Sequence, residues 1–494
     1  MSIYTSDFYS NMVLQHIRSQ ITTIPTYIFA GDGLSTTANP YDEVNSVYFI
    51  MNARNNIICG KRIKESDVKF MVRRINYTAN TVYAMYDDKD PELFNKDFFV
   101  INSQRTVYKC LFNNHDAPST VEPTSLDTAP VTLADGYIWQ LLFRLTRNQM
   151  TEFATDDFIP FVENLAVTTH ATPGSVEVVV VNDGGEDYPH HEGTVNQFIS
   201  NTLMRIDNGA SPVNGIYEDS AIFITAGPGV GGLSDITGYS SNGSGRYITL
   251  ETPLPTVTIN STYSIAPKIL IEGDGEGALA RAIMEQGEIS SVEVIESGEN
   301  YTQADVRIIA NTGYGSGANC RAIISPLPGH GGDVLSELNA KHLLFSAVFS
   351  GSESNNFPVG VTFSQYGIVS HLKQGANSNA TYTANTFNGT ALLTTIQING
   401  YYDKGDRLRC TTANDARAVV LAANVDHAIV MYTTRDHFSN TDNIISESGV
   451  TAAITGVVQP NIYPYDCKVL SITNINTVTR TDETEEAVNI ILRV

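Results

Sequence analysis

The sequence predicts a mainly β protein with an α+β body and a tandem array of small β modules inserted in its middle. Short runs of β-branched and aromatic residues recur between Asn, Asp, Gly and Pro turn signals, which is the pattern of strands. A glycine-rich stretch is repeated near the middle of the chain and indicates tandem modules. Helical periodicity is clear only near the N-terminus, so few long helices are expected.

The first third of the chain combines one predicted helix with several strands. Ser6 or Asp7 is placed to cap a short helix that Pro25 ends. Its apolar face consists of Tyr9, Met12, Val13, Ile17 and Ile21. Strands are predicted at Val47–Ile50, Thr81–Tyr86 and Phe98–Ile101. The Pro-rich stretch from Asp116 to Pro130 predicts a loop.

The clearest strand follows the turn Asp135-Gly136 and carries the only tryptophan of the chain. Alternate residues after this turn are aromatic or aliphatic, which predicts the inner face of a half-buried strand. These inner residues are Tyr137, Trp139, Leu141, Phe143 and Leu145, while Gln140 and Arg144 fall on the other face. We take Tyr137, Trp139, Leu141 and Phe143 as structural core candidates.

The repeat consists of Gly273–Ile283, which recurs as Gly313–Ile323. Between the two copies lies Ser291–Tyr301, which has an earlier relative in Ser175–Gly185. Glycine turns that separate short alternating strands predict small β modules packed in tandem. A weaker pattern, in which Tyr402–Asp406 and Phe438–Asp442 each precede a strand and a small-residue turn, indicates two related hairpins.

The chain ends with an acidic cluster, Asp482–Glu486, followed by alternating residues. Val488, Ile490 and Leu492 alternate with Asn489, Ile491 and Arg493, as expected of a strand that fills a sheet in the body. Ile490 and Leu492 are therefore further core candidates, and we expect the acidic cluster to be a solvated turn.

Composition restricts the classes of partner. The 53 acidic and 30 basic residues give a net charge of −23, which disfavours nucleic acid and anionic membranes as partners. The N-terminus does not resemble a secretory signal, and no apolar run approaches the roughly 20 residues that span a bilayer. The five cysteines are scattered, which predicts reduced, mostly buried thiols rather than disulfides or a zinc site.

No motif names a catalytic residue, a cofactor or a metal site. The glycine loops lack the GK[ST] sequence of a phosphate-binding loop, so hairpin turns are the better interpretation. The acidic loops Asn182–Asp187 and Glu272–Glu276 lack the spacing of calcium motifs and are expected to be solvated turns. The neighbours His190 and His191 do not chelate easily, and Asp156-Asp157 is expected to be exposed. We therefore expect a protein that is not an enzyme.

Four segments add a pattern of a different kind. The first runs from Val44 to Arg74, and the second comprises Val107–Leu111 with Asp135–Phe143. The third joins His342–Phe349 to Asn356–Gly360, and the fourth is Asp482–Leu492. In this order the segments resemble the wedge subunit called gene product eight in the tail baseplate of T-even-type contractile-tailed bacteriophages.

The resemblance implies a body formed by residues 1–165, 335–397 and 460–494, with inserted β regions at 166–330 and 398–459. It implies a structural subunit of the virion tail baseplate that assembles in the host cytoplasm. Its partners would be a second copy in a homodimer and other wedge proteins, and its role would be conformational coupling to sheath contraction. The repeated β modules favour an alternative function, a carbohydrate-binding adhesin or glycan-cleaving tail component. An exposed aromatic platform or a carboxylate pair in a groove would favour that alternative.

Overall fold

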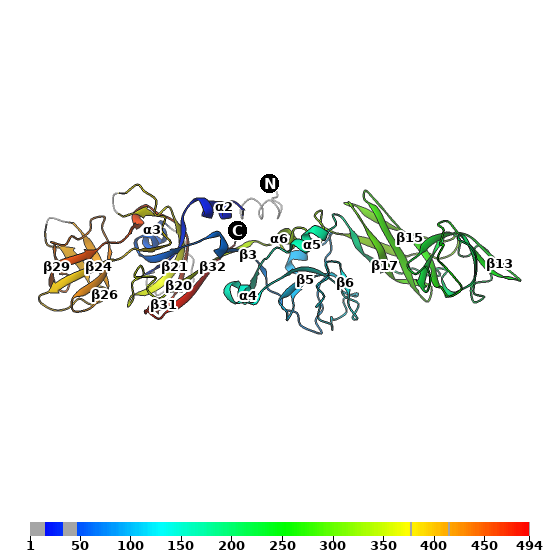
Figure 1. The fold of residues 1–494 in the computed structure, drawn as a ribbon, viewed down its shortest axis with the longest axis horizontal. Coiled ribbons are helices and arrows are strands. Elements are labelled where there is room, and N and C mark those ends of the chain that lie inside the picture. The colour runs from blue at the N-terminus through cyan, green and yellow to red at the C-terminus, as the bar shows by residue number, and fades with distance from the viewer. Residues whose placement is uncertain (1–14, 33–46, 376–377, 413–414, 494) are drawn as a thin grey trace. The chain divides into compact units, whose positions relative to one another are not determined.

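The computed structural model describes residues 15–32, 47–375, 378–412 and 415–493. Strands β1 to β32 dominate these residues, and none of their helices exceeds nine residues (Figure 1). The predicted mainly β fold class is therefore confirmed. The chain divides into two compact units. Unit 1 comprises Met1–Arg73, Asn148–Phe161 and Ala340–Val494, and unit 2 comprises Arg74–Arg147 and Val162–Asn339.

Unit 1 contains two antiparallel sheets that share one apolar core. The five-stranded sheet has the order β23 (Thr386–Asn388), β2 (Ile57–Arg62), β1 (Thr26–Gly31), β21 (Thr362–Ser370) and β31 (Lys468–Thr479). The four-stranded sheet has the order β32 (Glu485–Arg493), β20 (His342–Ser350), β3 (Val68–Arg73) and β8 (Phe158–Pro160). Buried residues of both sheets, among them Ile28, Ile368, Phe345 and Ile490, form one cluster. Burial of this shared core is the main force that holds the two sheets together.

Unit 1 also contains a closed six-stranded barrel with its own core. The barrel has the order β24 (Ala391–Gln397), β27 (His427–Tyr432), β26 (Arg417–Ala423), β25 (Arg407–Cys410), β28 (Asn443–Ser446) and β29 (Thr451–Val458). The two predicted hairpins are present as β25–β26 and β28–β29. Each begins after an aspartate turn in which the aspartate carboxylate accepts a backbone N–H, Asp406 from Asp403 and Asp442 from Ser439. A small two-stranded sheet pairs β22 (Lys373–Gln374) with β30 (Ile462–Tyr463).

The helices of unit 1 are short. They are α2 (Gln15–Thr23), α3 (Val47–Asn55), α4 (Arg147–Phe153) and the 3-10 turns η2 (Glu65–Asp67) and η4 (Pro464–Asp466). Helix α2 ends just before Pro25, whereas its predicted caps, Ser6 and Asp7, lie outside the described residues. The strand predicted at Val47–Ile50 is wrong, because these residues begin α3. Ala53 of α3 is buried while Val47 is 73% exposed, so packing of the helix outweighs the β propensity of its first turn.

Unit 2 contains a four-stranded sheet with the order β4 (Phe99–Ile101), β5 (Thr106–Phe112), β7 (Ile138–Arg144) and β6 (Val131–Thr132). Its short helices are η3 (Leu93–Asn95), α5 (Leu165–His170) and α6 (Val334–Glu337). The strand predicted at Thr81–Tyr86 is wrong. The N–H groups of that segment find partners on different neighbours, Ala84 on Asp97 and Tyr86 on Cys110, so no continuous ladder forms.

Strand β7 differs from its predicted half-buried form. Trp139 to Phe143 are all buried, so both faces of the strand are covered. Gln140, predicted to face outward, is buried and donates hydrogen bonds from Nε2 to the carbonyl oxygens of Thr128 and Leu141. The alternation in the sequence stops at Leu142, where the register with β5 shifts. The alternating pattern therefore predicted the strand but not the burial of its second face.

The second sheet of unit 2 has eleven strands. In order they are β10 (His191–Ser200), β11 (Leu203–Ile206), β14 (Gly245–Leu250), β13 (Leu233–Asn242), β12 (Ser220–Ala226), β15 (Thr262–Gly273), β16 (Glu276–Glu285), β17 (Glu288–Glu299), β9 (Val176–Asp183) and β19 (Asn319–Ile324), with β18 (Ala304–Ile309) paired to β15. The predicted division into a body and two inserted regions stays a prediction. None of the helices in the described ranges has the length and apolar character needed to cross a membrane.

Candidate functional site

The core candidates on β7 lie inside unit 2. Tyr137, Trp139, Leu141 and Phe143 are all at most 5% exposed. The indole of Trp139 stacks on Tyr137 with ring centroids 5.7 Å apart and meets Tyr83 edge-on at 5.8 Å. Because the Trp139 side chain is only 1% exposed, it offers no platform to a ligand.

The core candidates on β32 lie in unit 1. Ile490 is buried opposite Phe345, and Leu492 is partly buried opposite Leu343. The acidic cluster before them is only in part the solvated turn that was predicted. Glu486 belongs to β32 and forms an ion pair with Arg480, whose side chain is 1% exposed. That part of the prediction is wrong, because a buried guanidinium requires a nearby carboxylate.

The most unusual chemistry of unit 2 is a buried cluster of charged side chains. Lys109 of β5 and Glu337 of α6 form an ion pair whose side chains are 0% and 2% exposed. The Lys109 ammonium also lies 4.7 Å from the centroid of the Tyr86 ring. Glu337 accepts a further hydrogen bond from the backbone N–H of Gly331 at 2.7 Å. Buried charges persist only with such partners, so each group depends on the other.

His330 and Glu177 extend this cluster. The His330 ring meets Tyr86 edge-on with centroids 4.9 Å apart. Its Nδ1 lies 3.9 Å from Glu337 Oε2, and its Nε2 lies 3.9 Å from Glu177 Oε2. Within the described residues, neither His330 Nδ1 nor Glu177 Oε2 has a hydrogen-bond partner. We name Tyr86, Lys109, Glu177, His330 and Glu337 the buried charge cluster.

Burial and mutual charge set the protonation of this cluster. Burial lowers the pKa of His330, and the charge of Lys109 lowers it further, so the imidazole is neutral near pH 7. Burial would raise the pKa of Glu337, but the charge of Lys109 holds it below its usual value. Burial likewise lowers the pKa of Lys109, and Glu337 opposes that shift. The cluster thus contains one buried ion pair, Lys109 with Glu337, beside the neutral His330.

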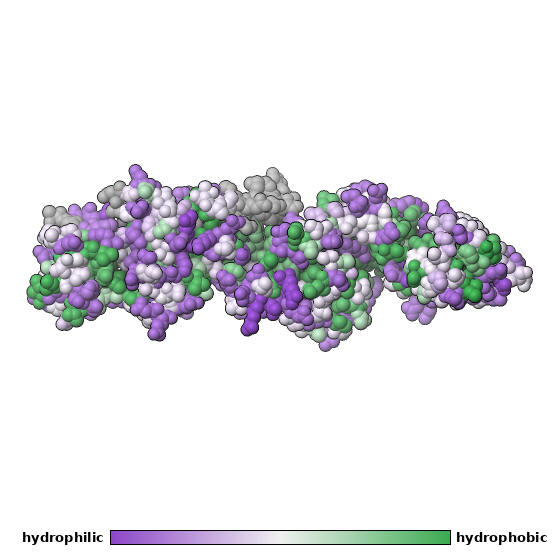
Figure 2. All heavy atoms as spheres, viewed as in Figure 1, coloured by the Kyte–Doolittle hydropathy of each residue, from purple (hydrophilic) through white to green (hydrophobic). Residues whose placement is uncertain are grey.

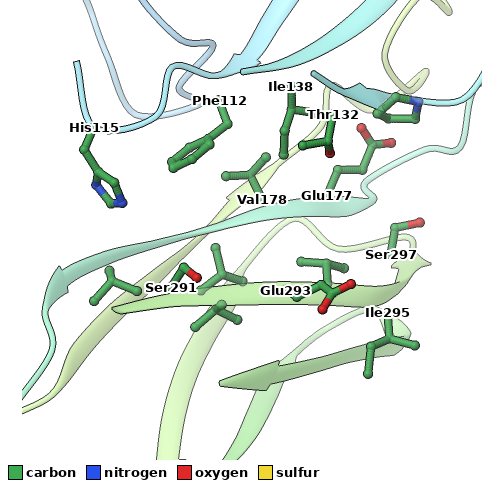
Figure 3. Close-up of a pocket in the computed structure, with 15 residues that line it drawn as sticks. Phe112, His115, Thr132, Ile138, Glu177, Val178, Ser291, Glu293, Ile295 and Ser297 are labelled. Atoms are coloured by element: carbon green, nitrogen blue, oxygen red, sulfur yellow. The ribbon is translucent and has the colours of Figure 1, made fainter. Parts of the chain in front are cut away.

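A crevice of about 380 Å³ adjoins the cluster through Glu177 (Figure 3). Phe112 and Ile138 from the four-stranded sheet face Val178 of β9 across it. The other wall is β17, with Val292, Val294 and Ile295 among the lining residues. Strands β9 and β17 pair only at Val179 and Val292, so the sheet opens beside the crevice. The lining of the crevice is mixed: valine and isoleucine side chains alternate with polar ones, and Glu177 and Glu293 place two carboxylates on it.

The two strands beside the crevice belong to a duplicated module. In one copy the Tyr188 ring covers Gly315, where an added Cβ would lie 2.2 Å from a ring carbon. In the other copy the Tyr301 ring covers Gly275, where the same contact would be 2.4 Å. We name the strands β9 and β19 the first module and β16 and β17 the second. Only glycine admits the tyrosine ring at these positions, which gives the repeated glycines a structural reason.

The remaining candidate motifs have local structural roles. The Asp274 carboxylate accepts hydrogen bonds from the Thr302 hydroxyl and from the backbone N–H groups of Thr302 and Gln303. These bonds, the hydroxyl bond most, lower the pKa of Asp274 to about 2. His191 Nε2 lies 3.0 Å from Asp207, whereas the neighbouring His190 is exposed. Asp156 and Asp157 are exposed.

All five cysteines are free and buried, as predicted. Among the described residues, no three or more His, Cys, Asp or Glu side chains lie together as metal ligands would.

The sequence did not reveal the buried charge cluster. Its members come from five separate places in the chain, and no spacing rule joins them. One signal was present, because Lys109 interrupts the otherwise apolar run Val107–Leu111. A lysine inside such a run requires a buried partner, but the sequence does not show which carboxylate supplies it.

Comparisons with known proteins add little. No family model matches the sequence, and no curated protein matches it. A chain in the virion of a native gene transfer agent particle is similar at 12% identity, over 52% of this chain and 83% of that chain, with a TM-score of 0.16. Values this low establish no shared fold.

Proposed function

We propose that this chain is a structural subunit of a contractile phage tail, located in a wedge of the virion baseplate. It acts by assembly with other proteins and not by catalysis. The observation that carries the proposal is the ordered resemblance of four segments to the wedge subunit, together with where three of them lie. The end of the first segment forms β3, the third segment contains most of β20, and the fourth contains most of β32. These three strands are consecutive neighbours in one sheet.

This adjacency supports the proposal for a physical reason. Segments more than a hundred residues apart in the chain pair in one hydrogen-bonded sheet, so three of the resembling segments are neighbours in space as well as ordered in sequence. Phe345 of β20 stands between Val68 of β3 and Ile490 of β32. Three of the four resembling segments thus meet in one sheet of unit 1, while the second forms β5 and β7 of unit 2.

In the proposed wedge the chain is a homodimer that contacts other wedge proteins. Tagged chain co-expressed with the tail proteins encoded by neighbouring genes should retain a defined subset of them through affinity capture and sedimentation. Antibody to the chain should label purified virions at the distal end of the tail. Intact virions that contain none of the chain would refute the proposal.

One observation favours the second candidate, a glycan-cleaving tail component. Glu177 and Glu293 line the same crevice, and paired carboxylates are the usual machinery of glycoside hydrolysis. One oxygen of each carboxylate, however, already has a protein partner, Ser175 for Glu177 Oε1 and Arg281 for Glu293 Oε2. Incubation with bacterial cell-wall glycans decides the question. If the chain cleaves these glycans and both Glu177→Gln and Glu293→Gln abolish the cleavage, the function is catalysis and not assembly.

A further inference from the structure

Strand β31 forms an open edge of the five-stranded sheet in unit 1. It pairs with β21 from Thr362 to Ser370, and no other described strand pairs with it. The strand is 12 residues long, and none of its residues is buried. Backbone N–H and C=O groups on an open edge are a template for another strand. This edge therefore has hydrogen-bonding capacity that unit 1 itself does not use in the described residues.

The composition of β31 lacks the usual protection of an edge. From Val469 to Thr479 the strand has no charged residue and no proline. The other long edge strand of unit 1, β32, carries Glu485, Glu486 and Arg493. The remaining edges of the two sheets, β23 and β8, are only three residues long. Natural proteins protect free edges with charge, proline, short length or β-bulges, and β31 has only bulges, at its two register shifts against β21. Its long uncharged stretch therefore marks a site of strand pairing.

We propose that β31 of a second copy of this chain pairs with this edge in antiparallel fashion and joins two five-stranded sheets into one. The inference rests on the proposed function, for which it supplies the dimer interface. A two-fold arrangement uses the same surface on both partners, which is the commonest design of protein dimers. The occupant must be a strand, because only an extended backbone matches a row of alternating donors and acceptors.

Charge explains why this edge suits a second copy. Each chain carries a net charge of −23, so two copies repel each other over most of their surfaces. Antiparallel self-pairing of β31 sets residues of the uncharged stretch against one another and creates no like-charge pair. Leu470, 56% exposed in the single chain, adds apolar area to the contact.

The test places charge on the edge. Leu470→Lys with Thr473→Lys changes two exposed residues of β31, and Leu470→Glu with Thr473→Glu does so with the opposite sign. The control is Leu392→Lys with Ile396→Lys, also exposed, on β24, which is paired on both sides in the closed barrel. Sedimentation velocity should show a dimer for wild type and control, a monomer for each β31 variant, and a dimer again when the two β31 variants are mixed.

Each outcome bears on a different claim. A wild-type protein that is monomeric at all concentrations refutes both the homodimer of the proposed function and this interface. A dimer that the β31 variants leave intact, or that the control also dissociates, refutes the interface alone. Amide exchange gives a measurement that needs no variant. The β31 amides of wild type should exchange faster on dilution into monomer, and exchange rates independent of concentration would overturn the proposal.

Discussion

At the residue scale, the buried charges of Lys109 and Glu337 depend on each other, because either one alone would destabilise the fold. Both are removed from water, and the cost of burying a charge is offset only by a close partner of opposite sign. Tyr86 and Gly331 supply further favourable contacts to the two groups. Removing one member leaves the other charged and unpaired in the interior of unit 2.

Lys109→Met should therefore destabilise unit 2 by about 3–5 kcal/mol. The double variant Lys109→Met with Glu337→Leu should recover much of this loss, because an apolar pair leaves no buried charge. Urea unfolding followed by the fluorescence of Trp139, the only tryptophan, reports on this unit. Arg281→Met is the control, since its partner Glu293 is half exposed and such pairs contribute about 1 kcal/mol or less. A Lys109→Met change no larger than the control's would show that the pair is dispensable.

His330 should make the stability of unit 2 depend on pH. Its pKa is lower in the folded protein than its usual value of about 6.5, so folding favours the neutral imidazole. Stability is then complete above that value and falls as the pH drops below it, by up to about 1.4 kcal/mol per pH unit. His330→Gln should flatten the curve in the window just below about pH 6.5, measured by urea unfolding with Trp139 fluorescence. An unchanged slope in this window would assign the pH dependence to other groups.

The core role of Trp139 is tested by shortening it. Trp139→Ala should cost about 3–5 kcal/mol because it leaves a cavity among enclosed aromatic rings. Trp139→Phe should cost less, because it fills part of the volume and removes the unpartnered indole N–H. Thermal unfolding followed by circular dichroism measures both. A Trp139→Ala protein with an unchanged melting temperature but lost partner binding would make the indole part of an interface instead.

At the element scale, the sequence was informative where one local rule governs an element. The strand after Gly136, the C-terminal strand and the repeated glycine strands follow from alternation and turn signals. Prediction failed at Val47–Ile50 because a short apolar run fits a strand or a helix, and packing of Ala53 decided the outcome. The crevice and the buried charge cluster could not be predicted, since both form where distant segments meet.

The duplicated module predicts equivalent effects at equivalent glycines. Gly275→Ala and Gly315→Ala each push a Cβ into a tyrosine ring and should each destabilise unit 2 by about 1–3 kcal/mol. Gly315 has a φ of 73°, so its substitution adds backbone strain. Gly243→Ala is the control, with no atom within 4 Å of the added Cβ. Chemical unfolding of the three variants compares them, and equal stability of Gly275→Ala and the control would contradict the role of the ring contact.

At the scale of the whole molecule, the chain enters and leaves the eleven-stranded sheet of unit 2 at two residues that lie side by side, Ser175 and Ser325. The backbone N–H of Ser325 donates to the carbonyl of Ser175 at 2.8 Å, and the N–H of Ser175 donates to the Ser325 hydroxyl at 2.8 Å. The two ends of the segment between these serines are thus held together by hydrogen bonds. Val167, by contrast, belongs to the core around Trp139, so the deletion proposed here begins after Ser175.

Excision of residues 176–324, with Ser175 joined to Ser325 by a short Gly-Ser linker, should give a soluble protein that still melts cooperatively. The junction is already closed, so a short linker adds little loop entropy. The deletion removes the ion pair of Arg321 with Asp87, which is partly exposed and contributes about 1 kcal/mol or less. It also removes Glu177 from the buried charge cluster and Val178 from the crevice wall opposite Phe112 and Ile138. Trp139 fluorescence should remain that of a buried indole. Removing only residues 276–299 is the control, because it takes β16 and β17 out of the sheet and leaves new open edges, which should promote aggregation. If the larger deletion aggregates and the smaller one folds, the large sheet completes the core around Trp139 and is no separable part of the molecule.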